Sequence, residues 1–123
     1  MEIKNLIMIV DDDARNIFAL ALTLKAKGYK VITCQSGKEA LELLFGDKQV
    51  GLVLMDMMMP EMDGYETIRL IRKNENTKDI PIVAVTAQAM AGDREKCIKA
   101  GANDYISKPI QVDILMEVVK QWV

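Results

Sequence analysis

The sequence predicts an α/β fold in which five parallel strands form a doubly wound sheet covered by helices on both faces. Short apolar runs rich in β-branched residues alternate five times with segments of helical periodicity, which is the pattern of repeated βα units. The runs carry almost no polar alternation, as is typical of strands buried on both faces. The 123 residues are 50% hydrophobic, which suffices for one core, and no Pro/Gly/Ser-rich linker divides them. We therefore expect residues 1–123 to form one domain, with no output domain in this chain.

The predicted strands end roughly one βα unit apart. Consecutive parallel strands need right-handed crossovers, so the intervening helices cover the sheet. Such sheets bind ligands at the carboxyl ends of their strands, beside the point where the strand order reverses. The five strands are expected at Leu6–Val10, Lys30–Cys34, Leu52–Met55, Ile82–Val85 and Tyr105–Ser107.

Two helices are predicted between the first three strands. The first helix starts near Ala14, with Asp13 as a candidate N-cap, and is closed by Gly28. For the second helix, Ser36 is a candidate N-cap, and Glu39 three residues later completes a capping box. Their apolar stripes consist of Ile17, Leu20, Ala21 and Leu24, and of Ala40, Leu41, Leu43 and Leu44.

Three further helices are predicted, the third of the five just after Gly64. The fourth, roughly Ala91 to Ala100, has a thin apolar stripe, so it should be the most loosely held helix; the alternative is an ordinary solvated helix. The other two have clear stripes, formed by Tyr65, Ile68 and Ile71 and by Ile114, Leu115, Val118, Val119 and Trp122.

The composition excludes several classes of function. The 16 basic and 18 acidic residues give a net charge of −2, which argues against direct binding of nucleic acids or membrane surfaces. Histidine is absent, which excludes Ser-His-Asp and Cys-His catalysis and His-ligated metal sites within the chain. Two distant cysteines are too few for a disulfide framework, so a reducing cytoplasm is the expected compartment. No segment reads as a signal peptide or a membrane span.

Polar side chains follow the predicted strands at the point where each strand ends. Asp11–Asp13 follow the first strand, Asp56 the third, Thr86 the fourth and Lys108 the fifth. Carboxylates gathered at one edge repel one another, and a hard divalent cation such as Mg²⁺ relieves that repulsion. A lysine and a hydroxyl suit a phosphoryl group, and a lone carboxylate such as Asp56 is a possible nucleophile.

Each of these residues also has a plainer interpretation. Asp13 is better explained as a helix cap than as a metal ligand, and Asp11 or Asp12 alone could be a cap too. Thr86 alone would be an ordinary strand-end hydroxyl, and Lys108 a solvated surface lysine. Only their combination at four strand ends favours a phosphoryl site.

Four motifs lie in order along the chain: IMIVDDD, LVLMDMMMPEMDG, PIVAVTA and DYISKP. On these motifs the sequence, from about residue 5 to 121, resembles the receiver domain of response regulators in two-component and phosphorelay signalling. The resemblance implies a flavodoxin-like (βα)₅ fold with strand order 2-1-3-4-5. The segment from Thr86 to Lys108 is similar to receivers attached to hybrid histidine kinases.

The resemblance implies roles for the residues at the strand ends. Asp56 is the expected phosphoacceptor. Asp11 and Asp12 are expected to hold Mg²⁺ together with Asp56, with Asp12 preferred as the direct ligand, and the backbone carbonyl of Met58 is a further metal ligand. Lys108 is expected to pair with the phosphoryl group.

Further roles concern switching and the surrounding backbone. Thr86 matches the switch hydroxyl that bonds the phosphoryl group, and Tyr105 matches the aromatic residue that turns inward when Thr86 moves. Backbone N–H groups of Met57 and Ala87 are expected to donate to the phosphoryl oxygens. The peptide bond between Lys108 and Pro109 is expected to be cis.

The implied function is that of a phosphoacceptor signalling domain rather than an enzyme, with at most self-phosphotransfer and slow autodephosphorylation. Because the chain has no histidine, its phosphoryl donor must be a histidine kinase or a histidine phosphotransfer domain, or a small acyl phosphate. A homodimer through the face of the fourth helix, fifth strand and fifth helix is possible. The alternatives are a Mg²⁺-dependent aspartyl-phosphate hydrolase of the haloacid-dehalogenase type and a pseudo-receiver that only binds. The hydrolases carry their nucleophile on the first strand and usually have a cap insertion, unlike this chain.

The residue two positions after the acceptor bears on the lifetime of the phosphoryl group. Many receivers have a polar residue there, whereas this chain has Met58, whose apolar side chain cannot orient a hydrolytic water. We therefore predict slow autodephosphorylation, which the amide of Gln88 could partly offset.

Overall fold

The computed structural model describes residues 6–46, 49–87 and 92–123. Its five strands are parallel and lie in the order β2-β1-β3-β4-β5, which confirms the predicted topology. The elements follow one another as β1 (Leu6–Val10), α1 (Ala14–Ala26), β2 (Lys30–Cys34), α2 (Gly37–Leu44), β3 (Leu52–Asp56), α3 (Gly64–Lys73), β4 (Ile82–Thr86), α4 (Asp93–Ala100), β5 (Asp104–Ser107) and α5 (Val112–Trp122).

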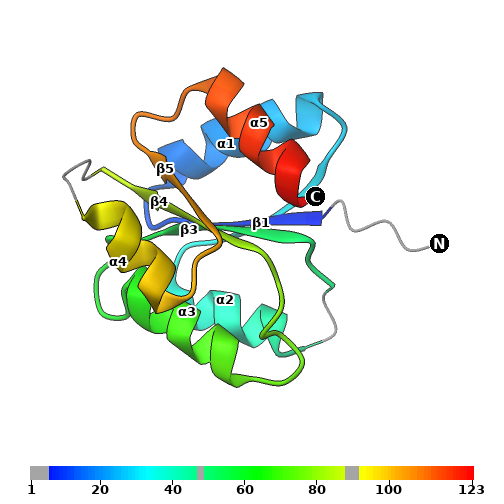
Figure 1. The fold of residues 1–123 in the computed structure, drawn as a ribbon. Coiled ribbons are helices and arrows are strands. Elements are labelled where there is room, and N and C mark those ends of the chain that lie inside the picture. The colour runs from blue at the N-terminus through cyan, green and yellow to red at the C-terminus, as the bar shows by residue number, and fades with distance from the viewer. Residues whose placement is uncertain (1–5, 47–48, 88–91) are drawn as a thin grey trace.

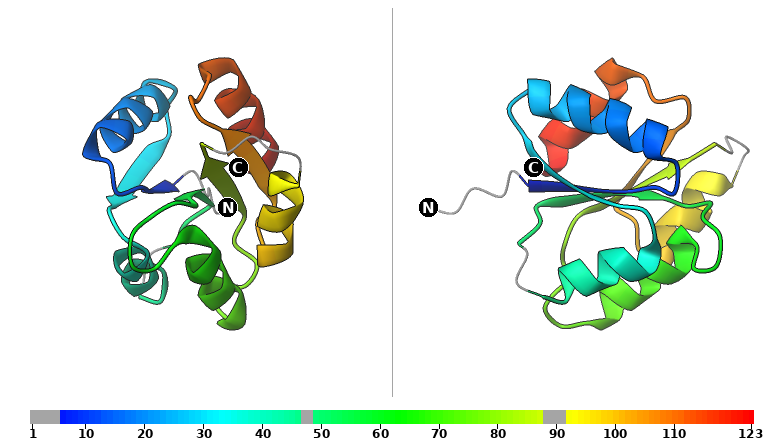
Figure 2. Two further views of the ribbon diagram at one scale, coloured as in Figure 1. Left: turned by 90° about the vertical axis from the view of Figure 1, so that its left-hand side faces the viewer. Right: turned by 180° about the vertical axis from the view of Figure 1, so that it is seen from behind.

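Helices cover both faces of the sheet, α1 and α5 on one side and α2, α3 and α4 on the other (Figures 1 and 2). Alternate residues of one strand point to opposite faces, so each strand supplies both layers of the core. Ile7 and Ile9 pack with α1 and α5, whereas Met8 and Val10 pack with the opposite layer. Both faces of the central strands β1, β3 and β4 are therefore buried, which explains their lack of polar alternation, whereas the edge strands β2 and β5 are partly exposed.

The strands match the predicted runs with small extensions. The first two have the predicted bounds, while β3 and β4 each continue by one residue, to Asp56 and Thr86. Asp56 pairs with Val85 and Thr86 with Ser107, so the backbone ladder extends into the first polar residue of each strand end. These two side chains are thereby fixed by the sheet rather than by a loop.

The N-terminal caps follow the predicted chemistry with one difference. The Asp13 carboxylate accepts a hydrogen bond from the Arg15 amide and caps α1. Ser36 Oγ accepts from the Glu39 amide at 3.1 Å, as in a capping box. The reciprocal bond, however, comes from the Gln35 amide to Glu39 Oε1 at 2.9 Å, one residue earlier than the box requires.

Helix α4 is sparsely packed, in agreement with its thin apolar stripe. Cys97 is its one buried residue, and the N-cap Gly92 offers no side-chain hydrogen bond. Tyr65 of α3 supports it, since its hydroxyl lies 3.9 Å from Cys97 Sγ and its ring lies 4.7 Å below the Lys96 ammonium. The predicted start of this helix at Ala91 lies outside the described residues.

The C-terminal end of α4 is held by Arg72 of α3. The Arg72 guanidinium donates to the carbonyl oxygen of Gly101 at 2.9 Å, to Asn103 Oδ1 at 2.8 Å and to the carbonyls of Lys78 and Ile80 at 2.8 and 2.7 Å. Gly101 has a φ of 121°, which favours glycine, and a Cβ there would lie 3.0 Å from Arg72 Cγ. The guanidinium thus ties the end of α4 to the α3–β4 connection.

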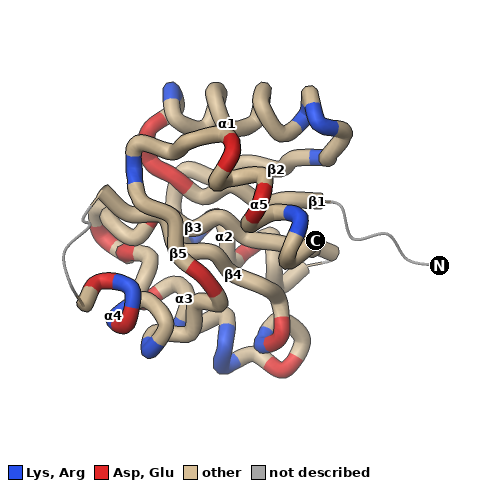
Figure 3. Tube along the Cα trace, turned by 45° about the horizontal axis from the view of Figure 1, so that its top comes forward, with Lys and Arg blue, Asp and Glu red and all other residues tan. Residues whose placement is uncertain are grey.

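Acidic and basic residues are interspersed over the helices, with α4 carrying both signs along its length (Figure 3). None of the helices in the described ranges is long and apolar enough to cross a membrane.

Candidate functional site

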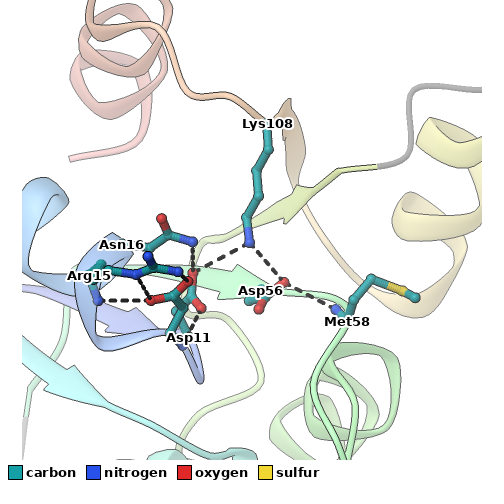
Figure 4. Close-up of polar contacts among 7 residues, drawn as sticks. Asp11, Arg15, Asn16, Asp56, Met58 and Lys108 are labelled. Carbon is teal, nitrogen blue, oxygen red and sulfur yellow. Dashed lines mark hydrogen bonds and ion pairs between the residues drawn. The ribbon is translucent and has the colours of Figure 1, made fainter.

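The polar residues predicted at the strand ends lie at one edge of the sheet. β1 and β3 are hydrogen-bonded neighbours, so Asp11, which follows β1, and Asp56, which ends β3, come together where the strand order reverses. Lys108 follows β5 and extends its side chain across the end of β4 toward both carboxylates (Figure 4). The site is therefore built by three separate strand ends.

Three carboxylates form the centre of this site. Oxygen atoms of Asp11, Asp12 and Asp56 all lie within 4.8 Å of one another. Asp11 and Asp56 are each only 3% exposed, whereas Asp12 is exposed to solvent. Asp11 is held by the Asp13 amide, which donates to its Oδ1 at 2.9 Å, and by the Asn16 amide, 3.5 Å from its Oδ2.

Asp56 has a perturbed acidity. Its pKa is raised from 3.8 to about 6, chiefly by burial and also by the nearby Asp11 carboxylate. The Met58 amide and the Lys108 ammonium oppose this effect, because both favour the ionised carboxylate. At neutral pH the side chain is therefore ionised and available as a nucleophile.

Lys108 joins the two buried carboxylates. Its ammonium nitrogen lies 3.5 Å from Asp11 Oδ2 and 3.5 Å from Asp56 Oδ1, and its side chain is 24% exposed. Its backbone amide donates to the Thr86 carbonyl at 2.8 Å, and the bond to Pro109 is cis. The lysine is thus a fixed positive charge at the site and not a solvated surface residue.

The two backbone amides after Asp56 have different partners. The Met57 amide donates to the Val85 carbonyl at 3.0 Å as part of the sheet, so it does not face the carboxylate. The Met58 amide does, at 3.1 Å from Asp56 Oδ1. The phosphoryl donor at Met57 therefore stays a prediction, and the amide that faces the Asp56 carboxylate in this structure is that of Met58, one residue later.

Gly64 allows the chain after Asp56 to fold back over the strand end. A Cβ at Gly64 would lie 2.6 Å from the Asp56 carbonyl oxygen and 2.7 Å from Met57 Cα, both backbone atoms that cannot move aside. The Gly64 amide donates to the Met57 carbonyl at 3.3 Å, which closes this loop. The position of the acceptor carboxylate thus depends on having glycine, which lacks a Cβ, at position 64.

Thr86 and Tyr105 lie on neighbouring strands. Thr86 is 2% exposed, and Tyr105 is half-buried. Tyr105 is in register with Ala84, two residues before Thr86, so both side chains lie on the same face of the sheet. Ala87 is exposed directly after Thr86, and Gln88 lies outside the described residues.

The sequence alone did not indicate two contributors to this site. Asn16 lies on the first turn of α1 and reaches Asp11, yet a single Asn near a helix start carries no special signal. The Met58 amide depends on the turn after β3, which the apolar run could not predict. Asp13 does not belong to the carboxylate cluster, and its role as a cap is confirmed.

The donor set fits a hard divalent cation. Mg²⁺ prefers carboxylate oxygens and commonly takes one or two of them together with water or phosphate oxygens. Here three carboxylates converge, two of them buried, and the single ammonium of Lys108 leaves the group with an excess of negative charge. The exposed Asp12 leaves one side of the cluster accessible to solvent.

Residues 7–120 match the family model of the response regulator receiver domain. The polar-differentiation response regulator DivK of Brucella ovis is 39% identical over 116 residues, which cover 94% of each chain. Among solved structures, the receiver domain of the sensor histidine kinase PA1611 from Pseudomonas aeruginosa, with magnesium ion coordinated in its active site cleft, has 36% identity, a TM-score of 0.87 and 95% coverage of both chains. A chain in the co-crystal structure of the Saccharomyces cerevisiae phosphotransfer protein Ypd1 with the receiver domain of Ssk1 has 26% identity, a TM-score of 0.85 and coverage of 95% of this chain and 87% of that chain.

Proposed function

The chain belongs to the response regulator receiver family of two-component signalling, and from that premise we propose that Asp56 accepts a phosphoryl group from a phosphohistidine. The donor is a histidine kinase or a histidine phosphotransfer domain, since the chain contains no histidine of its own. The two free cysteines are buried and unlinked, which suits a reducing cytoplasm.

The observation that carries this proposal is the placement of Lys108 against the acidic cluster. Its ammonium contacts Asp11 and Asp56 at the same distance of 3.5 Å, within a cluster that also includes Asp12. A binding module without phosphoryl chemistry would not need a nucleophile, an ammonium and a divalent-cation donor set in one place. A hydrolase would need a substrate-enclosing cap, whereas every described element here belongs to the sheet or its covering helices.

In the transfer, a carboxylate oxygen of Asp56 attacks the phosphorus in line with the leaving nitrogen. An O–P bond forms, the N–P bond of the phosphohistidine breaks, and the imidazole nitrogen leaves with the electron pair. Lys108 and the N–H groups of Met58 and Ala87 stabilise the charge on the equatorial oxygens. Asp56 must be ionised for this step, which its pKa of about 6 permits at neutral pH.

Asp11, Asp12 and Asp56, with the Met58 carbonyl, are the groups that would hold Mg²⁺. When bound, this ion supplies charge neutralisation for the phosphoryl oxygens. Asp11 is oriented for ligation by the Asp13 and Asn16 amides, so its position does not depend on the ion.

Switching is proposed to begin at Thr86. Its hydroxyl contacts the phosphoryl group only when Asp56 carries one, and a contact made in one state alone shifts a two-state equilibrium. Tyr105 lies on the same face of the sheet one strand away, and α4 packs beside it through a single buried residue. These elements are the ones we expect to respond.

The donor is proposed to dock over α1. Phe18 and Leu22 on this helix are 69% and 60% exposed, although both are large and apolar. A groove of about 550 Å³ continues from Lys108 between α1 and α5, lined by apolar side chains that include Leu20 and Leu115. Any protein that brings a phosphohistidine to Asp56 must cover this rim of the site.

The test of phosphorylation is incubation with acetyl phosphate and Mg²⁺ followed by intact mass measurement. We expect a gain of one phosphate that Asp56→Asn abolishes, that Asp12→Asn strongly reduces, and that the cap variant Asp13→Asn retains. No gain in the wild type would favour a pseudo-receiver, and turnover of free phosphomonoesters would favour a hydrolase. Either outcome would overturn the proposal.

Docking is tested separately with a phosphorylated histidine phosphotransfer domain as donor. Phe18→Ser and Leu22→Ser should slow transfer from this donor but not from acetyl phosphate, because the small donor needs no docking surface. Phe45→Ser is the matched control, since Phe45 is 46% exposed at the end of α2. Equal loss with both donors would show that the substitutions damage the site itself.

The phosphoryl group is expected to be long-lived. The Met58 side chain carries only a thioether, a weak acceptor, and so offers no group that orients a hydrolytic water at the acyl phosphate. A half-life of seconds for the isolated phosphorylated chain, followed by Phos-tag electrophoresis, would contradict this expectation.

A further inference from the structure

Met58 carries the most exposed thioether in the part of the chain that the structure describes. Its side chain is 55% exposed, whereas Met8, Met55 and Met57 are fully buried and Met59 is 7% exposed. Met62 and Met116 are half-buried. Oxidation of methionine requires access of the oxidant to sulfur, so these side chains should differ widely in reactivity.

The exposed sulfur belongs to a residue whose backbone touches the phosphoacceptor. The Met58 amide donates to Asp56 Oδ1 at 3.1 Å, while the side chain extends away from the carboxylate toward solvent (Figure 4). An oxidant can therefore reach the sulfur without entering the carboxylate cluster. The buried neighbours Met57 and Met59 keep the loop anchored while Met58 reacts.

We propose that Met58 is a methionine-oxidation site and that its sulfoxide shortens the lifetime of the phosphoryl group on Asp56; the second half rests on the proposed function. A hydroperoxide such as hydrogen peroxide is the oxidant. Its O–O bond breaks as one oxygen is transferred to the Met58 sulfur, which loses two electrons, and the peroxide is reduced to water. Methionine sulfoxide reductases reverse this modification.

The effect on lifetime follows from hydrogen bonding. A thioether is a weak acceptor, whereas a sulfoxide oxygen is a strong one. The unbranched side chain has three rotatable bonds and an exposed end, so the sulfoxide can turn toward a water beside the acyl phosphate. One hydrogen bond gained by that water in the transition state corresponds to about a two- to tenfold faster hydrolysis.

The experiment treats the full chain with hydrogen peroxide and follows each methionine by peptide mass spectrometry. Met58 should oxidise at least about tenfold faster than Met57, whose exposure requires local opening of the fold. The treated chain is then phosphorylated with acetyl phosphate, and loss of the phosphoryl group is timed. Its half-life should fall two- to tenfold and return after treatment with the reductases, and the half-life of Met58→Leu should not respond to peroxide.

Three results would overturn the proposal. Oxidation of Met57 or Met62 as fast as that of Met58 would show that Met58 is not a selective oxidation site. An unchanged half-life after complete Met58 oxidation would show that the sulfoxide does not affect the lifetime of the phosphoryl group. A half-life that falls equally in peroxide-treated Met58→Leu would place the effect elsewhere, with Met62→Leu as the next variant. Failure of the untreated chain to accept phosphate would instead refute the proposed function, and the peptide masses would still decide the oxidation site.

Discussion

Replacing Asp56 by Asn should stabilise the cation-free protein, although it removes the proposed phosphoacceptor. The pKa of Asp56 rises from 3.8 to about 6 on folding, and one pKa unit corresponds to about 1.4 kcal/mol, so ionisation of this side chain costs the folded state about 3 kcal/mol. An Asn side chain accepts the same hydrogen bond from the Met58 amide without a charge, and Lys108 keeps its contact with Asp11. We therefore expect Asp56→Asn to be more stable by about 3 kcal/mol at pH 8.

The pH dependence provides the sharper test. Between pH 4 and 6 the folded state binds more protons at Asp56 than the unfolded state, so the stability of the wild type falls as pH rises through this range. The stability difference between the two proteins should thus be small near pH 4 and complete above about pH 7. Urea unfolding in EDTA across this range measures it, with Glu42→Gln on the exposed face of α2 as the control. Equal stabilities at every pH, or a more stable wild type at pH 8, would refute the electrostatic reasoning.

Three further substitutions test the loop after β3, the attachment of α4 and the N-cap of α2. Gly64→Ala should cost about 2 kcal/mol or more and slow phosphorylation by acetyl phosphate, because its Cβ meets the Asp56 carbonyl oxygen at 2.6 Å; an unchanged rate would show that the loop can relax. Arg72→Met should cost about 2 kcal/mol or more in urea unfolding through the loss of four hydrogen bonds, without altering the phosphorylation rate of the folded protein, whereas exposed Arg69→Met should be neutral. Ser36→Ala should lower the free energy of unfolding by about 1 kcal/mol, because the N-cap of α2 is lost. An unchanged midpoint of thermal unfolding would contradict this prediction.

The three central strands could be predicted because both of their faces are buried. A continuous apolar run records side-chain burial, which is why β1 has the predicted bounds; the edge strand β2 also has its predicted bounds, although Lys30 and Thr33 are exposed. Asp56 and Thr86 were left out of the runs, yet their backbones remain in the ladder. Hydrophobicity reports on side chains, whereas a strand ends where backbone pairing ends, so the last polar residue of a buried strand escapes the pattern.

The acidic cluster was predictable from topology alone, because parallel strands bring their carboxyl ends to one edge. The local direction of the backbone after a strand could not be predicted in this way. The choice of the Met58 amide over the Met57 amide depends on where the chain turns after β3. The contacts of Arg72 could not be predicted from the sequence either, because they join one long side chain to carbonyls that lie 6 to 29 residues away in the sequence.

The unequal attachment of α4 has a mechanical consequence. Its last residues are held by the Arg72 guanidinium and by the close packing of Gly101 against α3, while Gly92 at its start contributes no side-chain cap. The helix therefore resembles a lever with its pivot at Gly101. Any rearrangement that starts beside Thr86 should displace the Asp93 end of α4 much more than the Ala100 end. Amide hydrogen exchange should show the same gradient, fastest in the first turn and slowest at the pivot.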